Sequence, residues 1–77
     1  MSAVLQEIDQ ALAGYARQHQ ARPVAVYLGE RKLTQLILDI ALLGKLPELS
    51  TAEGRPLAYR NLDLLRDEVN VDGVRVI

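Results

Sequence analysis

The feature that most constrains the fold is a short apolar run that passes through one glycine into a leucine-rich segment. Residues 24–28 read VAVYL, with no charged or amide side chain among them, and Gly29 follows. A strand that is apolar at every position is typical of one covered on both faces, as in the centre of a small sheet. Pro23 ends any preceding helix, because the residue before a proline avoids the α region. The sequence therefore predicts a strand over residues 24–28 that leads directly into a helix.

The helix after Gly29 is predicted to run from Glu30 to Leu43, with Gly44 as its C-terminal stop. At about 100° per residue, one side of this helix carries the apolar residues expected to face the core. These are Leu33, Leu36, Ile37, Ile40, Ala41 and Leu43. Two further leucines, Leu38 and Leu42, lie about 140° and 180° from Leu33, beside Arg31 and Gln35. The segment therefore has more leucines than one buried face needs.

The N-terminal segment also has a helical period, and a helix is predicted over residues 2–20. Ser2 is a suitable N-cap, and Gly14 lies opposite the apolar arc. That arc contains Val4, Leu5, Ile8, Ala11, Leu12, Tyr15, Ala16 and His19.

The C-terminal third allows more than one interpretation. Asp72-Gly73 between Val71 and Val74 is a strong signal for a two-residue hairpin, which would place Val69 opposite Val76. Alternatively, LDLLRDE (residues 62–68) forms a strand of its own, with a longer loop before a last strand at residues 74–77. A short helix over residues 57–67 is a third interpretation, because leucine and arginine favour helices.

The order α-β-α-β-β predicts a single α+β domain over residues 1–77, with two helices packed on a small sheet of two or three strands. If the strand before the second helix pairs in parallel with a later one, the crossover should be right-handed. The chain has no Cys, Trp or Phe, so the core should be aliphatic with the three tyrosines at its margins. A domain of 77 residues without disulfides is near the lower limit of independent stability, so a second copy is an expected source of stabilisation.

Composition and charge favour a soluble, cytoplasmic protein. Apolar residues are 49% of the chain, charged residues 25%, and the formal net charge is −1. The N-terminus does not have the pattern of a signal peptide, and no apolar run approaches the roughly 18 residues of a membrane span. Because the net charge is slightly negative, nucleic acid is not the expected partner. A small basic patch could still be formed by Arg17, Arg22, Arg31 and Lys32.

No catalytic, metal or cofactor site is predicted. The sole histidine, His19, has no nucleophile or carboxylate near it in sequence, and no second histidine or cysteine could share a metal. The C-terminal carboxylates alternate with arginines, which is typical of a solvated face with weak ion pairs. They are Asp63, Asp67, Glu68 and Asp72. There is no phosphate-binding glycine motif, so neither a cofactor nor a small-molecule substrate is expected.

Leu38 and Leu42 are the strongest functional signal. Either another segment of the same chain covers them, or they form an i, i+4 ridge at an interface that includes Gln35 and Arg31. Burying two leucines would contribute roughly 3–6 kcal/mol before the cost of association. An exposed edge of the C-terminal strands offers a second route to association, by strand addition.

Three segments, VYLGERKLTQLILD, LPEL and YRNLDLLRDEVNVDGVRVI, resemble a pattern found in small phage- and prophage-encoded proteins of unknown function. The likeness spans residues 24–77. Asn61 stands where that pattern has a turn glycine, and asparagine tolerates the left-handed conformation. The resemblance implies a mobile-element origin and provides no binding residues.

The expectation from the sequence is thus a non-enzymatic protein-interaction module that forms a homodimer and binds a protein partner. The alternative is a nucleic-acid-associated accessory protein that uses the basic patch. An enzyme would need a cleft that gathers His19 with two of the C-terminal carboxylates.

Overall fold

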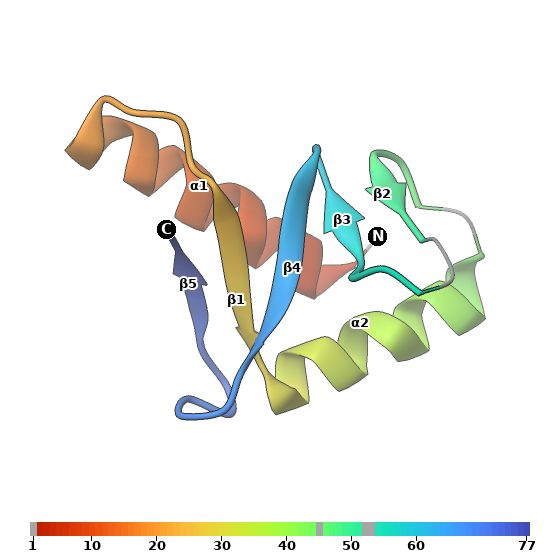
Figure 1. Cartoon of the computed structure of the whole chain (residues 1–77). Helices are drawn as coiled ribbons and strands as arrows, with labels where there is room; N and C mark the ends of the chain where they lie inside the picture. The colour runs from red at the N-terminus through yellow and green to blue at the C-terminus, as the bar shows by residue number, and fades with distance from the viewer. Residues whose placement is uncertain (1, 45, 52–53) are drawn as a thin grey trace.

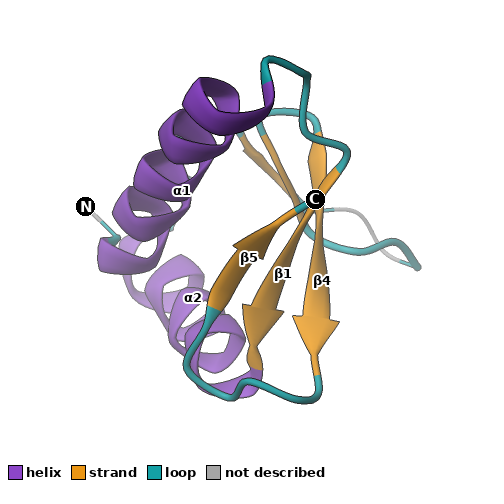
Figure 2. Cartoon of the chain, turned by 90° about the vertical axis from the view of Figure 1, so that its left-hand side faces the viewer, coloured by secondary structure: helices purple, strands orange, loops and turns teal. Residues whose placement is uncertain are grey.

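The computed structural model describes residues 2–44, 46–51 and 54–77, which fold into two layers. Both helices lie on one face of a five-stranded mixed sheet, and within these described residues no helix covers the opposite face (Figures 1 and 2). The elements are α1 (Ala3–His19), β1 (Ala25–Gly29), α2 (Glu30–Leu43), β2 (Leu49–Ser50), β3 (Ala58–Tyr59), β4 (Leu62–Asp67) and β5 (Val74–Val76). The α+β class predicted from the sequence is confirmed, but the sheet is larger than two or three strands.

The strand order is β2-β3-β4-β1-β5, so the apolar strand β1 is internal, between β4 and β5. It pairs in parallel with β4, Val26 opposite Leu64, and antiparallel with β5, Val26 opposite Val76. In Figure 1 the helices lie behind the sheet and the chain moves from β1 through α2 to β4 on the right. The crossover is therefore right-handed, as expected for a parallel pair.

Helix α1 starts as predicted, because the Ser2 hydroxyl accepts a hydrogen bond from the Leu5 backbone N–H at 3.4 Å. The same hydroxyl donates to Asp39 of α2 at 2.7 Å, so the cap also joins the two helices. The predicted apolar arc is buried only in its first half, at Val4, Leu5 and Ile8. Ala16 and His19, further along, are exposed.

Helix α2 has the predicted bounds, but its buried face is narrower than expected. Leu36 is fully buried, and Leu33 and Ile40 pack against the core. Ile37, Ala41 and Leu43, also expected in the core, are exposed. Ile37 and Ala41 lie about 100° and 140° from Leu36, away from the line along which α2 contacts β1 and β4, so they face solvent. Leu43 lies only about 20° from Leu36, but it is the last residue of α2.

The predicted hairpin at Asp72-Gly73 is absent, so that prediction is wrong. The alternative, a separate strand at residues 62–68 followed by a longer loop and a last strand, is confirmed. β4 ends at Asp67, a loop over residues 68–73 follows, and β5 pairs with β1 rather than with β4. Val69 is therefore outside the sheet and 86% exposed. The short helix over residues 57–67 is likewise wrong, because β3 and β4 occupy that segment.

A two-residue hairpin does occur, between β3 and β4. Its central residues Arg60 and Asn61 have φ of 53° and 65°, and the flanking Tyr59 and Leu62 are opposite each other. Positive φ at both central positions is what a type I′ turn requires, and asparagine accepts it readily. The expectation that Asn61 occupies a left-handed turn position is confirmed.

The loop over residues 68–73 lies directly against Gly29, where β1 becomes α2. A Cβ atom built on Gly29 would come within 2.4 Å of the Val71 backbone and closer still to the Asn70 carbonyl oxygen. The Val71 carbonyl accepts the Arg31 backbone N–H at 2.8 Å, and the Gly73 carbonyl accepts that of Gly29 at 2.9 Å. Helix α2 has no side-chain cap, so this loop provides a partner for one of its free N–H groups.

The core lies between the sheet and the two helices and is almost entirely aliphatic, as predicted. Tyr59 is the exception: it is 7% exposed and belongs to the core rather than to its margin. The buried cluster contains Val4, Leu5, Ile8, Val26, Leu28, Leu36, Leu46, Tyr59 and Leu64.

Replacing Gly29 with alanine should destabilise the fold by about 3 kcal/mol, because the new methyl group would overlap loop backbone that cannot rotate away. Gly14→Ala is the matched control: nothing lies within 4 Å of its Cβ position, and helix propensity predicts up to about 1 kcal/mol of stabilisation. Urea unfolding of both variants checks this. Equal stability of Gly29→Ala and the parent chain would contradict the close contact.

Acid should weaken the same loop through Asp67. Its carboxylate accepts N–H groups of Val69 at 2.9 Å and Asn70 at 3.2 Å, which hold its pKa below the usual 3.8, and Arg75 at 3.9 Å acts in the same direction. Because the pKa of Asp67 is lower in the folded than in the unfolded chain, its ionised carboxylate stabilises the fold. This contribution is complete above pH 3.8 and is lost as the pH falls through the folded-state pKa.

Asp67→Asn should therefore unfold at lower urea than the parent at pH 7, and the difference should shrink as the pH falls below 3.8. Asp63→Asn is the control, because it removes an exposed carboxylate from the same strand that accepts no hydrogen bond from the described residues. It should show no such convergence. A difference that stays constant with pH would argue against the role of the ionised carboxylate.

Candidate functional site

The outward side of α2 carries an exposed apolar stripe. Leu38 is 50% exposed, Leu42 81% and Ile37 53%, and Ala41 lies between them on the same side of the helix. At about 100° per residue these four positions fall within one arc of about 140°, opposite the buried Leu36. The described chain thus leaves Leu42 largely exposed and Leu38 half exposed, so its own segments do not bury the two leucines singled out from the sequence. We refer to Ile37, Leu38, Ala41 and Leu42 as the α2 stripe.

The stripe continues beyond the helix toward the loop over residues 68–73. Leu38 and Val71, which is 44% exposed, line the same shallow groove of about 480 Å³. Gln35 and Arg31, also predicted at the interface, line it too. Arg31 is held by a weak exposed ion pair with Asp72 at 3.5 Å, and Gln35 donates to Asp39 at 3.0 Å. The structure therefore brings all four predicted interface residues together on one side of α2.

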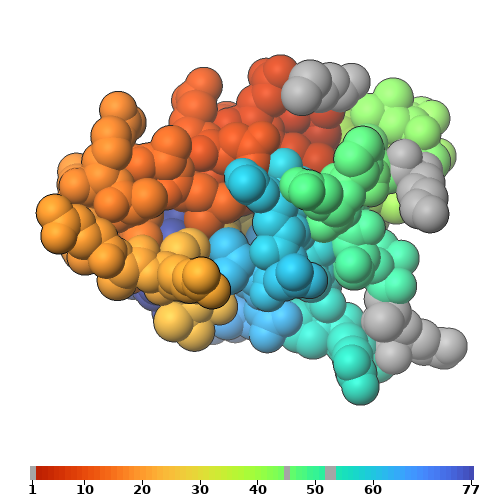
Figure 3. Space-filling view, turned by 90° about the horizontal axis from the view of Figure 1, so that it is seen from above, coloured from red at the N-terminus to blue at the C-terminus, as the bar shows by residue number. Residues whose placement is uncertain are grey.

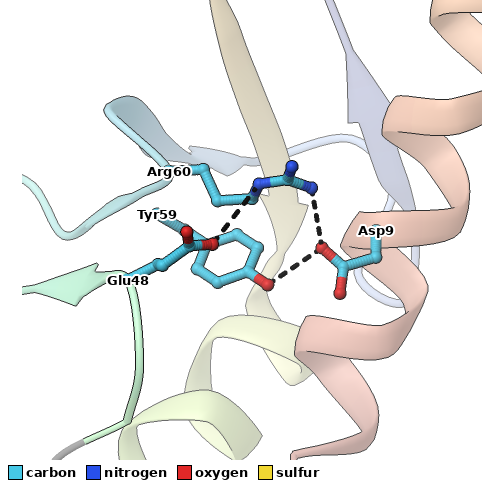
Figure 4. Close-up of polar contacts among 4 residues, drawn as sticks. All are labelled: Asp9, Glu48, Tyr59 and Arg60. Atoms are coloured by element: carbon cyan, nitrogen blue, oxygen red, sulfur yellow. Dashed lines mark hydrogen bonds and ion pairs between the residues drawn. The ribbon is translucent and has the colours of Figure 1, made fainter.

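A second feature is a polar network that joins α1 to the β3–β4 hairpin (Figure 4). The Asp9 carboxylate accepts a hydrogen bond from the Tyr59 hydroxyl at 2.9 Å and pairs with the Arg60 guanidinium at 3.4 Å. Arg60 in turn pairs with Glu48 at 3.5 Å, and its backbone N–H donates to the Glu48 carbonyl at 3.0 Å. The left-handed turn at Arg60 places its backbone and its side chain within reach of these partners.

Burial and the hydrogen bond to Asp9 raise the pKa of Tyr59 to about 12. The tyrosine therefore stays protonated and donates its hydrogen bond throughout the neutral range. It is a structural link between α1 and the hairpin.

A groove of about 490 Å³ lies next to this network (Figure 3). From above, a hollow separates the red-to-orange surface of α1 from the light-blue surface of the β3–β4 turn. Its lining comes from three separate segments: Asp9, Leu12, Ala13 and Ala16 of α1, Arg22 and Pro23 before β1, and Arg60 and Leu62 of the hairpin. We refer to it as the upper groove.

The predicted basic patch is divided by the fold. Arg17 and Arg22 lie where α1 ends and the chain approaches β1, whereas Arg31 and Lys32 follow the other end of that strand. Lys32 is also neutralised by Glu7 at 2.7 Å. The four side chains do not form one surface.

His19 lies near the exposed end of α1 and stacks on Tyr15, with ring centroids 4.4 Å apart. Asp67 is opposite Gly29, and Asp72 pairs with Arg31, both at the far end of β1. The structure therefore does not bring His19 together with these carboxylates. Among residues 2–44, 46–51 and 54–77, no group of three His, Cys, Asp or Glu side chains could hold a metal ion.

The face of the sheet without helices carries Tyr27 at its centre. The Arg75 guanidinium lies 4.8 Å from the centre of the Tyr27 ring and also pairs with Asp67. These contacts are made within the chain and stabilise the pairing of β1 with β5.

The sequence did not reveal the upper groove because its residues come from three segments with no shared motif. Two small residues, Ala13 and Ala16, next to Leu12 on α1 were the only local sign of a hollow there. Ile37 was also missed as a surface residue, because the predicted core face of α2 was too wide.

Comparisons with protein-family models, with curated proteins and with solved structures found no match. Within the described part of the chain, neither helix has the length and apolarity to cross a membrane.

Replacing Tyr59 with phenylalanine should lower the free energy of unfolding by about 1 kcal/mol at neutral pH, because one part-buried hydrogen bond is lost. Because the pKa of Tyr59 is higher in the folded than in the unfolded chain, its protonated hydroxyl stabilises the fold. This contribution is complete below pH 10 and is lost as the pH rises from 10 through about 12. The parent chain should therefore lose stability relative to Tyr59→Phe above pH 10.

Urea unfolding at several pH values between 7 and 11 measures this difference. Tyr15→Phe is the matched control, since the Tyr15 hydroxyl has no hydrogen bond to the described residues. If Tyr59→Phe and Tyr15→Phe follow the same alkaline profile, the hydrogen bond to Asp9 does not hold the hairpin.

Proposed function

We propose that this protein is a small non-enzymatic interaction module that pairs with a second copy of itself through the α2 stripe and then binds a protein partner. The observation that carries the proposal is the contiguous exposed surface of Ile37, Leu38, Ala41 and Leu42. An apolar surface binds by excluding water and has no group that could transfer a proton, so its chemistry is that of association.

The geometry of the stripe suits a two-fold arrangement of antiparallel helices. With Leu38 on the symmetry axis, Thr34 of one protomer would lie opposite Leu42 of the other, because both are four residues from Leu38. Arg31 would then lie near the C-terminus of the other α2. The last turn of α2 has no basic residue of its own, so a cation there would interact favourably with the helix dipole.

The size of the domain also supports self-association. A chain of 77 residues with no cysteine has little core, and four leucines buried across a two-fold axis would contribute roughly 6–12 kcal/mol before the cost of association. The likeness of residues 24–77 to small phage- and prophage-encoded proteins supports a mobile-element origin for the module.

Light scattering tests the pairing. The parent chain is expected to have twice the 8.5 kDa mass of one protomer, and Leu38→Asp/Leu42→Asp should be a folded monomer. The carboxylates should raise the dissociation constant at least about a thousandfold, because four of them would be buried per dimer.

Val24→Asp/Val69→Asp is the matched control. These valines are 76% and 86% exposed but lie outside α2, so this variant should stay dimeric. A monomeric parent chain, or a double α2 variant that remains a dimer, would refute self-association through the stripe. Circular dichroism of each variant separates a monomer from an unfolded chain.

A further inference from the structure

The upper groove has an apolar floor and a charged rim. Leu12 and Leu62 are half-buried and pack against the core, so their exposed methyl groups form the floor. Ala13 and Ala16 on the α1 wall are too short to fill the space, which leaves a groove of about 490 Å³. This volume is within the range of small-molecule sites, which are mostly apolar with a few polar groups that orient the ligand.

The two arginines on the rim differ in their partners. Arg60 is paired with Asp9 at 3.4 Å and with Glu48 at 3.5 Å, so its charge is neutralised within the chain. Arg22 forms no ion pair with any residue of the described segments, and it is exposed at the edge of the groove. Arg22 is therefore a rim cation without a carboxylate partner in the described chain, and it lies beside an apolar floor.

The apolar floor and the unpaired Arg22 determine which class of ligand suits the upper groove. A phosphate or another compact dianion would leave the apolar floor uncovered and would bring two charges toward Asp9. A neutral apolar compound would cover the floor but would form no ion pair with Arg22, whose exposed guanidinium would stay hydrated. A single carboxylate satisfies that guanidinium through two parallel hydrogen bonds, and an apolar body attached to it covers the leucine and alanine side chains.

We propose that the upper groove binds a small monocarboxylate with an apolar body, whose carboxylate pairs with Arg22 while its hydrocarbon part lies on Leu12, Ala13, Ala16 and Leu62. The hydrogen bond between Tyr59 and Asp9 holds the two walls at a fixed separation, so the site is formed before the ligand arrives. No residue of α2 lines the groove, and ligand binding is therefore independent of self-association.

Octanoate is the probe, titrated into the full chain while amide chemical shifts are followed by NMR. Shifts should map to the segments around Ala13, Arg22 and Leu62, with a dissociation constant of about 1 mM or below. Octanamide, which has the same chain without the charge, should bind at least about tenfold more weakly.

Two variants and one control locate the site. Arg22→Ala should weaken octanoate binding at least about tenfold, and Ala16→Leu should abolish it by filling the groove. Arg17→Ala removes an exposed arginine that does not line the groove and should leave binding unchanged.

The proposal is overturned by any of three results. These are no saturation at about 10 mM octanoate, shifts that map to α2 instead, and equal affinity of the parent chain and Arg22→Ala. Each of them leaves the light-scattering result on the α2 stripe unaffected, so the two proposals fail separately.

Discussion

The fold depends on the contact between the Gly29 backbone and the loop over residues 68–73. Only a residue without a side chain permits this approach, since a Cβ on Gly29 would overlap the Asn70 and Val71 backbones. The contact fixes three things together: the end of β1, the first turn of α2, and the path by which the chain leaves β4. Because the loop crosses the end of β1, it carries β5 to the far side of that strand.

The same junction determines which residues of α2 face solvent. With the first turn held by the Val71 carbonyl, Leu36 points into the core and Leu38 and Leu42 point away from the sheet. The second fixed point is the cap at Ser2, whose hydroxyl bonds to Asp39 further along α2. Helix α2 is thus held at its start by the loop and along its length by α1, and its outward side stays uncovered.

The sequence predicted the first half of the fold well because its signals are local. The periods of α1 and α2, the apolar run of β1, the Ser2 cap and the Gly44 stop all depend on neighbouring residues, and their elements were confirmed to within one or two residues at each end. The same helical period placed Leu38 and Leu42 off the core face but left open whether another segment of the chain covers them, and the fold leaves them exposed. Val24 was assigned to β1 but lies before it, 76% exposed.

The C-terminal half could not be predicted in the same way, because long-range contacts decide it. β2 and β3 have two residues each and exist only through pairing with their neighbours, so no period marks them. Asp72-Gly73 has the residues of a hairpin turn, but Gly73 does not have a positive φ. The loop there is held by Asp67 and by Gly29, and the pairing of β5 with β1 overrides the local preference.

The two surfaces proposed for function differ in origin. The α1 side has too little side-chain volume to fill the space beside the hairpin, and the α2 side has more apolar residues than the core can bury. On α1 the short side chains of Ala13 and Ala16 leave a hollow beside the β3–β4 hairpin, which is joined to the helix by the hydrogen bond between Tyr59 and Asp9. On α2 there are more leucines than the narrow contact with β1 and β4 can bury, so apolar surface remains outside. A second copy placed on α2 would form a third layer behind the helices, while the upper groove, lined by α1 and the hairpin, would stay open to a small ligand.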